Sequence, residues 1–236
     1  MNWLNLRRFL PLLMVGILSH VPMAASAQMD WITPHLQSLE FGRQIDQIVE
    51  QSRTGGATQQ QATSVDALFV PSAARTQENV SRFIRLSEQA GDGGQLRSYF
   101  VAQPTLMGEI AQAMRGANLD PQNVADCYAL WWMAVWQAAN GVTGDPDSRT
   151  VAAVRRQARD VFATTPGFAE TSDADRQQYA EALMLQTLLL SAANEQFQGN
   201  PAALRQLASS ARQGAVASGV DISRMTLTSD GFVMSF

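Results

Sequence analysis

Hydrophobic positions are densest between Asp120 and Asn140, where apolar side chains cover nearly the whole circumference of one predicted helix. A helix that is apolar on all sides is buried by its neighbours rather than laid on a surface. Asp120 is the expected N-cap, Pro121 fits the first helical position, and Gly141 follows the end, where a left-handed residue closes many helices. This pattern predicts a central helix. Its tryptophans are Trp131, Trp132 and Trp136.

Weaker helical patterns with capping signals flank the central helix on both sides. They cover residues 29–51, 76–90, 95–102, 104–116, 148–163, 173–198 and 202–218. The last residues, 225–236, alternate around Asp230-Gly231 and predict a small β-hairpin. A hairpin needs a third strand or a helix face for stability, and Leu68-Phe69-Val70 is a candidate strand. The predicted fold is all-α: a single bundle of about six to eight helices around the tryptophan-rich helix, with a minor C-terminal hairpin.

The first 27 residues have the features of a secretory signal peptide. Arg7 and Arg8 form a charged region, residues 9–21 are apolar, and Ala25-Ser26-Ala27 is a cleavage site of small residues. We expect Sec export, cleavage near Ala27, and a periplasmic or secreted mature protein without a transmembrane span. Residues 28–51 then form a helical arm that is available to a protein partner, 52–65 a flexible linker, and 66–236 the core domain.

Composition excludes several chemistries. The chain has no lysine, which removes the P-loop, Schiff-base chemistry and Ser–Lys dyads. The mature chain keeps only His35, so a histidine-rich metal site cannot form, and Cys127 is the single cysteine. Loss of two arginines with the signal moves the net charge from −4 to −6, which argues against a nucleic-acid partner. No cofactor and no metal site is predicted.

Asn123 and Asp126, near the start of the central helix, are the polar residues that most need an explanation. A buried carboxylate without a partner is very costly. Arg75 and Asn79, four residues apart on another predicted helix, are suitable donors. We therefore predict a polar latch that joins the two helices. The alternative is a ligand or catalytic pocket at Asp126, lined by Trp132, Trp136, Gln137 and Glu181.

Two functional hypotheses follow. The first is a non-catalytic exported domain that acts through protein contacts. The second is a cell-envelope hydrolase or sugar-binding protein, because glycoside cleavage uses two carboxyl groups across a cleft. Glu109, Asp126 and Glu181 lie on three predicted core helices and could supply such a pair, although Glu109 and Glu181 also fit solvated helix flanks. A sealed, fully paired Asp126 would favour the first hypothesis.

Several spacings occur together along the core domain. They are Arg75-x3-Asn79-x3-Phe83, Gly116-x2-Leu119-x3-Asn123-Val124-Ala125-Asp126-x-Tyr128, Trp132-x3-Trp136-Gln137, Ala180-Glu181-Ala182-Leu183 and Leu227-Thr228-x2-Gly231-Phe232. This set resembles the DUF6683 family of exported bacterial proteins of unknown function. The resemblance runs from about residue 69 to 232 and leaves the arm and linker outside. It implies an exported, mostly helical single domain and transfers no catalytic activity.

Overall fold

The computed structural model describes residues 67–89, 93–165 and 167–234. The predicted signal peptide, arm and linker lie outside these residues. The described chain forms seven α-helices, one 3-10 turn and a two-stranded hairpin, which confirms the predicted helical bundle with a minor hairpin. The elements are α4 (Ala73–Gln89), α5 (Gly93–Ala102), α6 (Leu106–Gly116), α7 (Val124–Asn140), α8 (Ser148–Thr164), α9 (Asp173–Gln196), α10 (Pro201–Ala217), η1 (Ile222–Arg224), β1 (Met225–Thr228) and β2 (Gly231–Met234).

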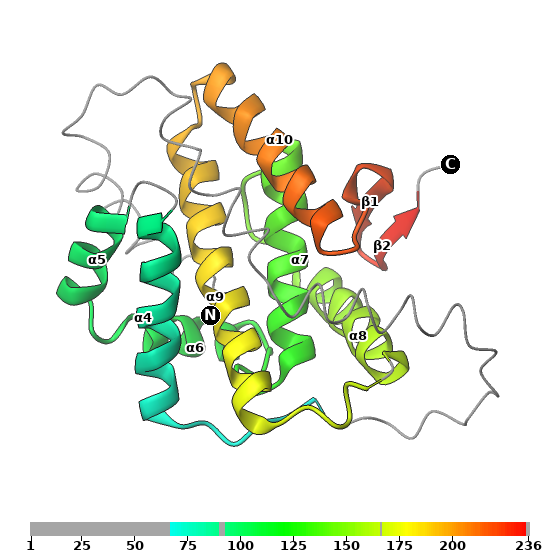
Figure 1. Ribbon diagram of the computed structural model, residues 1–236. Helices are drawn as coiled ribbons and strands as arrows, with labels where there is room; N and C mark the ends of the chain where they lie inside the picture. The colour runs from blue at the N-terminus through cyan, green and yellow to red at the C-terminus, as the bar shows by residue number, and fades with distance from the viewer. Residues whose placement is uncertain (1–66, 90–92, 166, 235–236) are drawn as a thin grey trace.

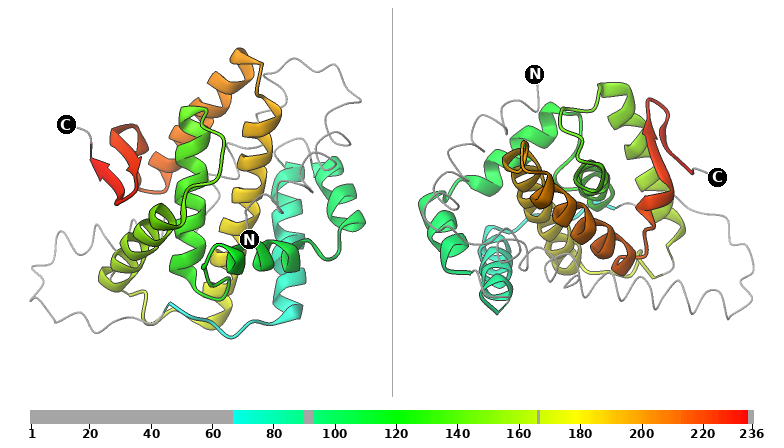
Figure 2. Two further views of the ribbon diagram at one scale, coloured as in Figure 1. Left: turned by 180° about the vertical axis from the view of Figure 1, so that it is seen from behind. Right: turned by 90° about the horizontal axis from the view of Figure 1, so that it is seen from above.

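Helix α7 is the central element, as its apolar pattern predicts. It packs against α8, α9 and α10. Figure 1 shows α9 and α8 on opposite sides of α7, and the view from above in Figure 2 looks nearly along its axis. Helix α4 packs on α9 and so lies one helix away from α7. Trp131 is fully buried at the middle of this arrangement.

The start of α7 differs from the expected one. The N-cap is Asn123 rather than Asp120, because the Asn123 side chain accepts hydrogen bonds from the backbone N–H groups of Ala125 and Asp126. The Asp120 carboxylate instead accepts from the N–H of Gln122, which holds residues 120–123 in a turn before the helix. The expected end is confirmed, since Gly141 takes a left-handed conformation with φ of 63°.

Residues 67–70 do not pair with the hairpin, so the predicted third strand is wrong. Leu68 forms an isolated antiparallel bridge with Asn123, and Phe69 N donates to Gln122 O at 3.1 Å. Val124 N in turn donates to Ala67 O at 2.9 Å. This extended segment therefore satisfies backbone groups at the N-terminus of α7, where the helix itself offers no partner.

The hairpin is stabilised by helix faces. Phe232 stacks on Trp132 with ring centroids 4.4 Å apart. The side-chain amide of Gln157 on α8 both donates to Phe232 O and accepts from Phe232 N, each at 2.8 Å. On the other strand, Trp136 Nε1 donates to Met225 O at 2.9 Å. Two helices thus supply partners for outward-facing backbone groups of a hairpin that two strands alone would not hold.

Among the described helices, none combines the length and the apolar character needed to cross a membrane.

Candidate functional site

Asp126 occupies the third position of α7, counted from its cap Asn123, and its side chain is completely buried. In a capping box, a side chain at this position accepts from the backbone N–H of the capping residue, whereas Asp126 reaches three residues further back. Here Asp126 Oδ2 accepts from the backbone N–H of Asp120 at 2.8 Å. The acid therefore belongs to the local cap before any long-range partner is considered, and the helix dipole adds to its stability.

Two arginines of α8 complete the environment of Asp126. Arg155 Nε lies 3.0 Å from Oδ1 and 2.9 Å from Oδ2 of the carboxylate. Arg159 donates from Nε to Oδ1 at 3.0 Å and from Nη2 to Oδ2 at 3.3 Å. Such charged partners offset the desolvation of a buried carboxylate. We call these three residues the Arg–Asp–Arg cluster; it joins the first turn of α7 to the middle of α8.

The predicted partners of Asp126 were wrong. Arg75 Nε donates to Gln177 Oε1 at 2.8 Å and its Nη2 to Val70 O at 2.6 Å, whereas Asn79 Nδ2 donates to Glu181 Oε2 at 2.6 Å. The reason is the order of the helices, because α4 packs mainly against α9 and α5. Asn123 acts as a helix cap, as described above. Ligand binding by these residues stays a prediction.

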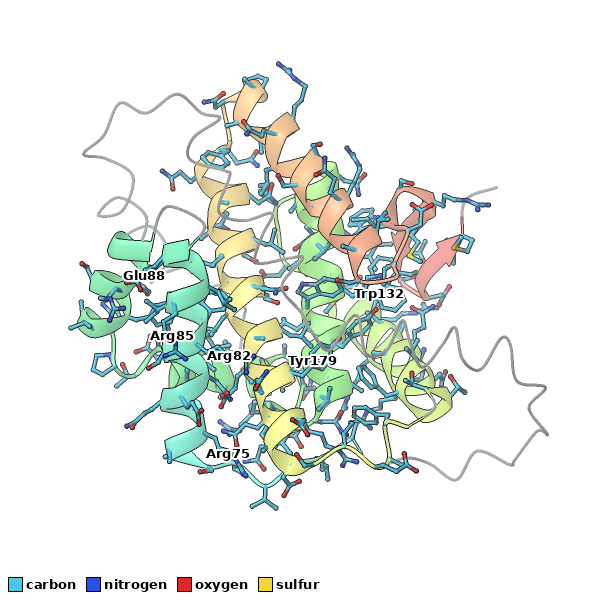
Figure 3. All side chains as sticks on the ribbon, viewed as in Figure 1. Arg75, Arg82, Arg85, Glu88, Trp132 and Tyr179 are labelled. Atoms are coloured by element: carbon cyan, nitrogen blue, oxygen red, sulfur yellow. The ribbon has the colours of Figure 1, made fainter. Side chains whose placement is uncertain are left out.

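Glu181 is buried, at 6% exposure, so its alternative reading as a solvated flank residue is wrong. It accepts from Thr76 Oγ1 at 2.6 Å, from Asn79 Nδ2 at 2.6 Å and from Gln177 Nε2 at 2.9 Å. Gln177, fully buried, also bonds to both the N–H and the C=O of Ser72. These hydrogen bonds form a polar seam between α4 and α9. Arg75, labelled in Figure 3, lies on α4 beside the first turns of α9. Both carboxylate oxygens of Glu181 are engaged in it.

The aromatic and amide residues proposed as pocket lining are mostly held by internal contacts. Trp132 stacks on Phe232 and lies 5.7 Å from the Tyr128 ring, centroid to centroid. Trp136 is bound to the hairpin through Met225, and Gln137 Nε2 donates to Gly144 O at 2.7 Å. In the described part of the chain, the indole N–H of Trp132 has no hydrogen-bond partner.

The remaining candidate residues, Cys127 and Glu109, are held in environments that do not favour reactivity. Cys127 is fully buried, and burial, followed by the nearby charge of Asp126, raises the pKa of its thiol well above the ordinary range. Glu109 is hydrogen-bonded by Thr105 Oγ1 at 2.6 Å, one turn earlier. No group of three His, Cys, Asp or Glu side chains that could hold a metal ion occurs within the described residues.

Sequence reasoning missed Arg155, Arg159 and Gln177. Arg155 and Arg159 are four residues apart on a helix whose range was predicted, so they share one face. That spacing was as good a signal as the spacing of Arg75 and Asn79. Gln177 and Glu181 have the same spacing in a helix whose middle is almost entirely apolar, a pattern that favours a buried polar pair.

The fold and the site define a mostly helical domain with a central tryptophan-rich helix tied to its neighbour by the Arg–Asp–Arg cluster. The model of the DUF6683 family, a family of unknown function, matches residues 34–235, and the chain belongs to this family. The match begins inside the predicted arm, so the expectation that arm and linker lie outside the resemblance is wrong. No curated protein and no solved structure matches the chain.

Proposed function

We propose that this chain is an exported, non-catalytic domain that acts by binding another molecule, and that its buried acids maintain the fold. The observation that carries the proposal is the state of Asp126, which is fully buried and bonded by Arg155, Arg159 and the Asp120 N–H. A general acid or nucleophile must reach a substrate atom, and these contacts occupy both oxygens of the carboxylate. Glu181 is similarly occupied by three neutral donors.

The test of the non-catalytic role is a search for glycan cleavage. Purified mature protein is incubated with cell-envelope glycans, and new reducing ends are measured beside a glycosidase of known activity. We expect no turnover by the wild-type protein. Turnover that disappears in D126N but persists in D120N, a change in an acid of the preceding turn, would overturn the proposal in favour of an acid-pair hydrolase.

Export is proposed from the signal-like residues 1–27. The full chain, expressed in a bacterium with a C-terminal tag, should be recovered outside the cytoplasm. Mass spectrometry of the recovered chain should place its first residue near Gln28. A variant with residues 9–21 deleted should stay in the cytoplasm at full length. A wild-type chain that remains uncleaved inside the cell would contradict this part of the proposal.

Partner contacts are proposed to involve the arm, residues 28–51, because it carries apolar side chains outside the core domain. A photo-crosslinker at Trp31 tests this in whole cells. Val216 on α10, which is 61% exposed, is the matched control position. Adducts of a discrete mass at Trp31 and not at Val216 support the arm. Equal labelling at both positions would remove it as the contact surface.

A further inference from the structure

We propose that the outer edges of Arg155 and Arg159 form a binding site for a phosphate group. The inference rests on the proposed binding role and adds a ligand class to it. Both side chains are anchored on one buried carboxylate, yet they remain partly exposed, at 32% for Arg155 and 46% for Arg159. The inner edges of the guanidinium groups thus hold the fold, while the outer edges face solvent.

The unused donors of the two arginines are the first argument. Arg155 contacts Asp126 through Nε alone. Arg159 uses Nε and Nη2. Within the described residues, no hydrogen bond is made by Nη1 or Nη2 of Arg155 or by Nη1 of Arg159. A guanidinium carries five N–H donors, so several donors of this pair are available to an anion.

Charge and preorganisation are the second argument. Two guanidinium groups and one carboxylate leave the Arg–Asp–Arg cluster with one net positive charge, on a chain whose overall charge is −4. Arg156 and Asp160, both exposed on the same helix, cancel each other and leave this balance unchanged. Because Asp126 already orders both arginines, an incoming anion need not restrict their rotamers. An exposed, unanchored arginine pair would have to be ordered on binding.

The shape of the remaining donor set favours phosphate. Both arginines meet the carboxylate through Nε, so their free N–H groups lie on two separate guanidinium groups and do not form one planar fork. A carboxylate matches a single planar fork, whereas a tetrahedral phosphate presents oxygens in several directions and can accept from both guanidiniums. The source is either free phosphate, as the ion or a soluble ester, or a lipid headgroup, and the two are separated by experiment.

Titration calorimetry of the mature protein with inorganic phosphate tests the site at constant ionic strength, with chloride as the balancing ion. Arg155→Gln should weaken phosphate binding at least about tenfold, since a charged hydrogen-bond donor is lost. Arg149→Gln is the matched control. Arg149 lies on the same helix and pairs with the exposed Asp230 at 2.7 Å, away from Asp126. This control should change affinity by less than about twofold.

Arg155→Lys is the second variant, in case Arg155→Gln does not fold. A lysine retains a positive charge for Asp126 but lacks the outer N–H donors of the guanidinium group. It should bind phosphate more weakly than wild type while its melting temperature in chloride shows a folded protein. Equal losses in Arg155→Gln and Arg149→Gln, or no binding by wild type, would overturn the site. Neither result would show that the protein is an enzyme. The non-catalytic proposal is therefore judged separately, by the glycan-cleavage assay.

Sedimentation with vesicles identifies the source of the phosphate. Phosphatidylglycerol vesicles that carry down wild type, but carry down Arg155→Gln several-fold less, support a lipid headgroup. Phosphatidylcholine vesicles are the control for a headgroup without net charge. Calorimetric binding of inorganic phosphate without vesicle binding supports a soluble phosphate. Vesicle binding that Arg155→Gln and Arg149→Gln reduce equally would contradict a lipid site at Arg155.

Discussion

At the residue scale, Asp126 shows how a buried charge is made tolerable. The carboxylate is desolvated completely, whereas its arginine partners keep part of their surface in water. The desolvation cost therefore falls mainly on the acid, and the arginines offset it. It follows that the two sides of the cluster are not equivalent. Removal of the acid leaves two guanidinium charges that water can solvate. Removal of both arginines leaves a carboxylate charge that water cannot reach.

This asymmetry gives a stability prediction. Asp126→Asn should lower the free energy of unfolding by about 1–3 kcal/mol, because charged hydrogen bonds are lost but Arg155 and Arg159 can be rehydrated. Arg155→Gln with Arg159→Gln should cost more, about 3–5 kcal/mol, because the buried carboxylate then loses both of its charged partners. Urea unfolding of both variants measures the order. A double variant more stable than Asp126→Asn would refute this account of the cluster.

Cys127 provides a second test at this scale. Burial raises the pKa of its thiol, so the folded chain holds the neutral, unreactive form. An aromatic disulfide reagent at pH 8 should label the thiol of unfolded protein quickly and that of folded protein only at the rate of opening. The raised pKa also means that this group favours folding less as pH rises above the ordinary thiol range. Fast labelling under native conditions would show an accessible thiol.

At the element scale, the hairpin takes hydrogen bonds from α8 as well as from its own strands. Gln157 replaces a third strand at Phe232, as its amide bonds both backbone groups of that residue. This close approach restricts the neighbouring position: a Cβ on Gly231, where φ is 100°, would lie 2.5 Å from Gln157 Oε1. Glycine is needed there both for its backbone conformation and for space.

Gly231→Ala should therefore lower the free energy of unfolding by about 1–3 kcal/mol, from backbone strain and from displacement of Gln157. Gln157→Ala should also destabilise the protein, because it removes both bonds to Phe232. The double variant separates the causes: if the clash matters, the two changes together should cost less than their sum. Chemical denaturation of all three variants measures this. Strict additivity would leave strain at Gly231 as the whole effect.

The elements themselves were largely predictable from sequence, and the partners of their buried polar side chains were not. Ser172 caps α9 by accepting from Asp175 N at 3.2 Å, and Gly141 closes α7 as expected. These signals act within a few residues of chain. The partners of Asp126 lie 29 and 33 residues away, and nothing local distinguishes Arg155 from Arg75. Which helix brings its arginines to Asp126 follows from side-chain complementarity over the whole core, and spacing alone does not reveal it.

At the scale of the whole molecule, burial decreases from the centre outward. α7 has α8, α9 and α10 around it, while α5 packs mainly against α4. Val124, Ala125 and Cys127 in the first turns of α7 are completely buried, whereas Val101 near the end of α5 is 75% exposed. Two polar clusters join pairs of helices in this arrangement. The polar seam at Glu181 joins α4 to α9, and the Arg–Asp–Arg cluster joins α7 to α8.

This gradient predicts the order of amide hydrogen exchange. Amides of α7 should exchange slowest, at the rate set by global unfolding, because opening this helix exposes the core on every side. Amides of α5 should exchange much faster through local opening. Hydrogen-exchange mass spectrometry of wild type measures both. Asp126→Asn supplies the comparison, because it should speed exchange in α7 and α8. In the same variant, the exchange rate of α5 relative to that of the unfolded chain should not change. Exchange in α7 as fast as in α5 would mean that α7 is not the centre of stability.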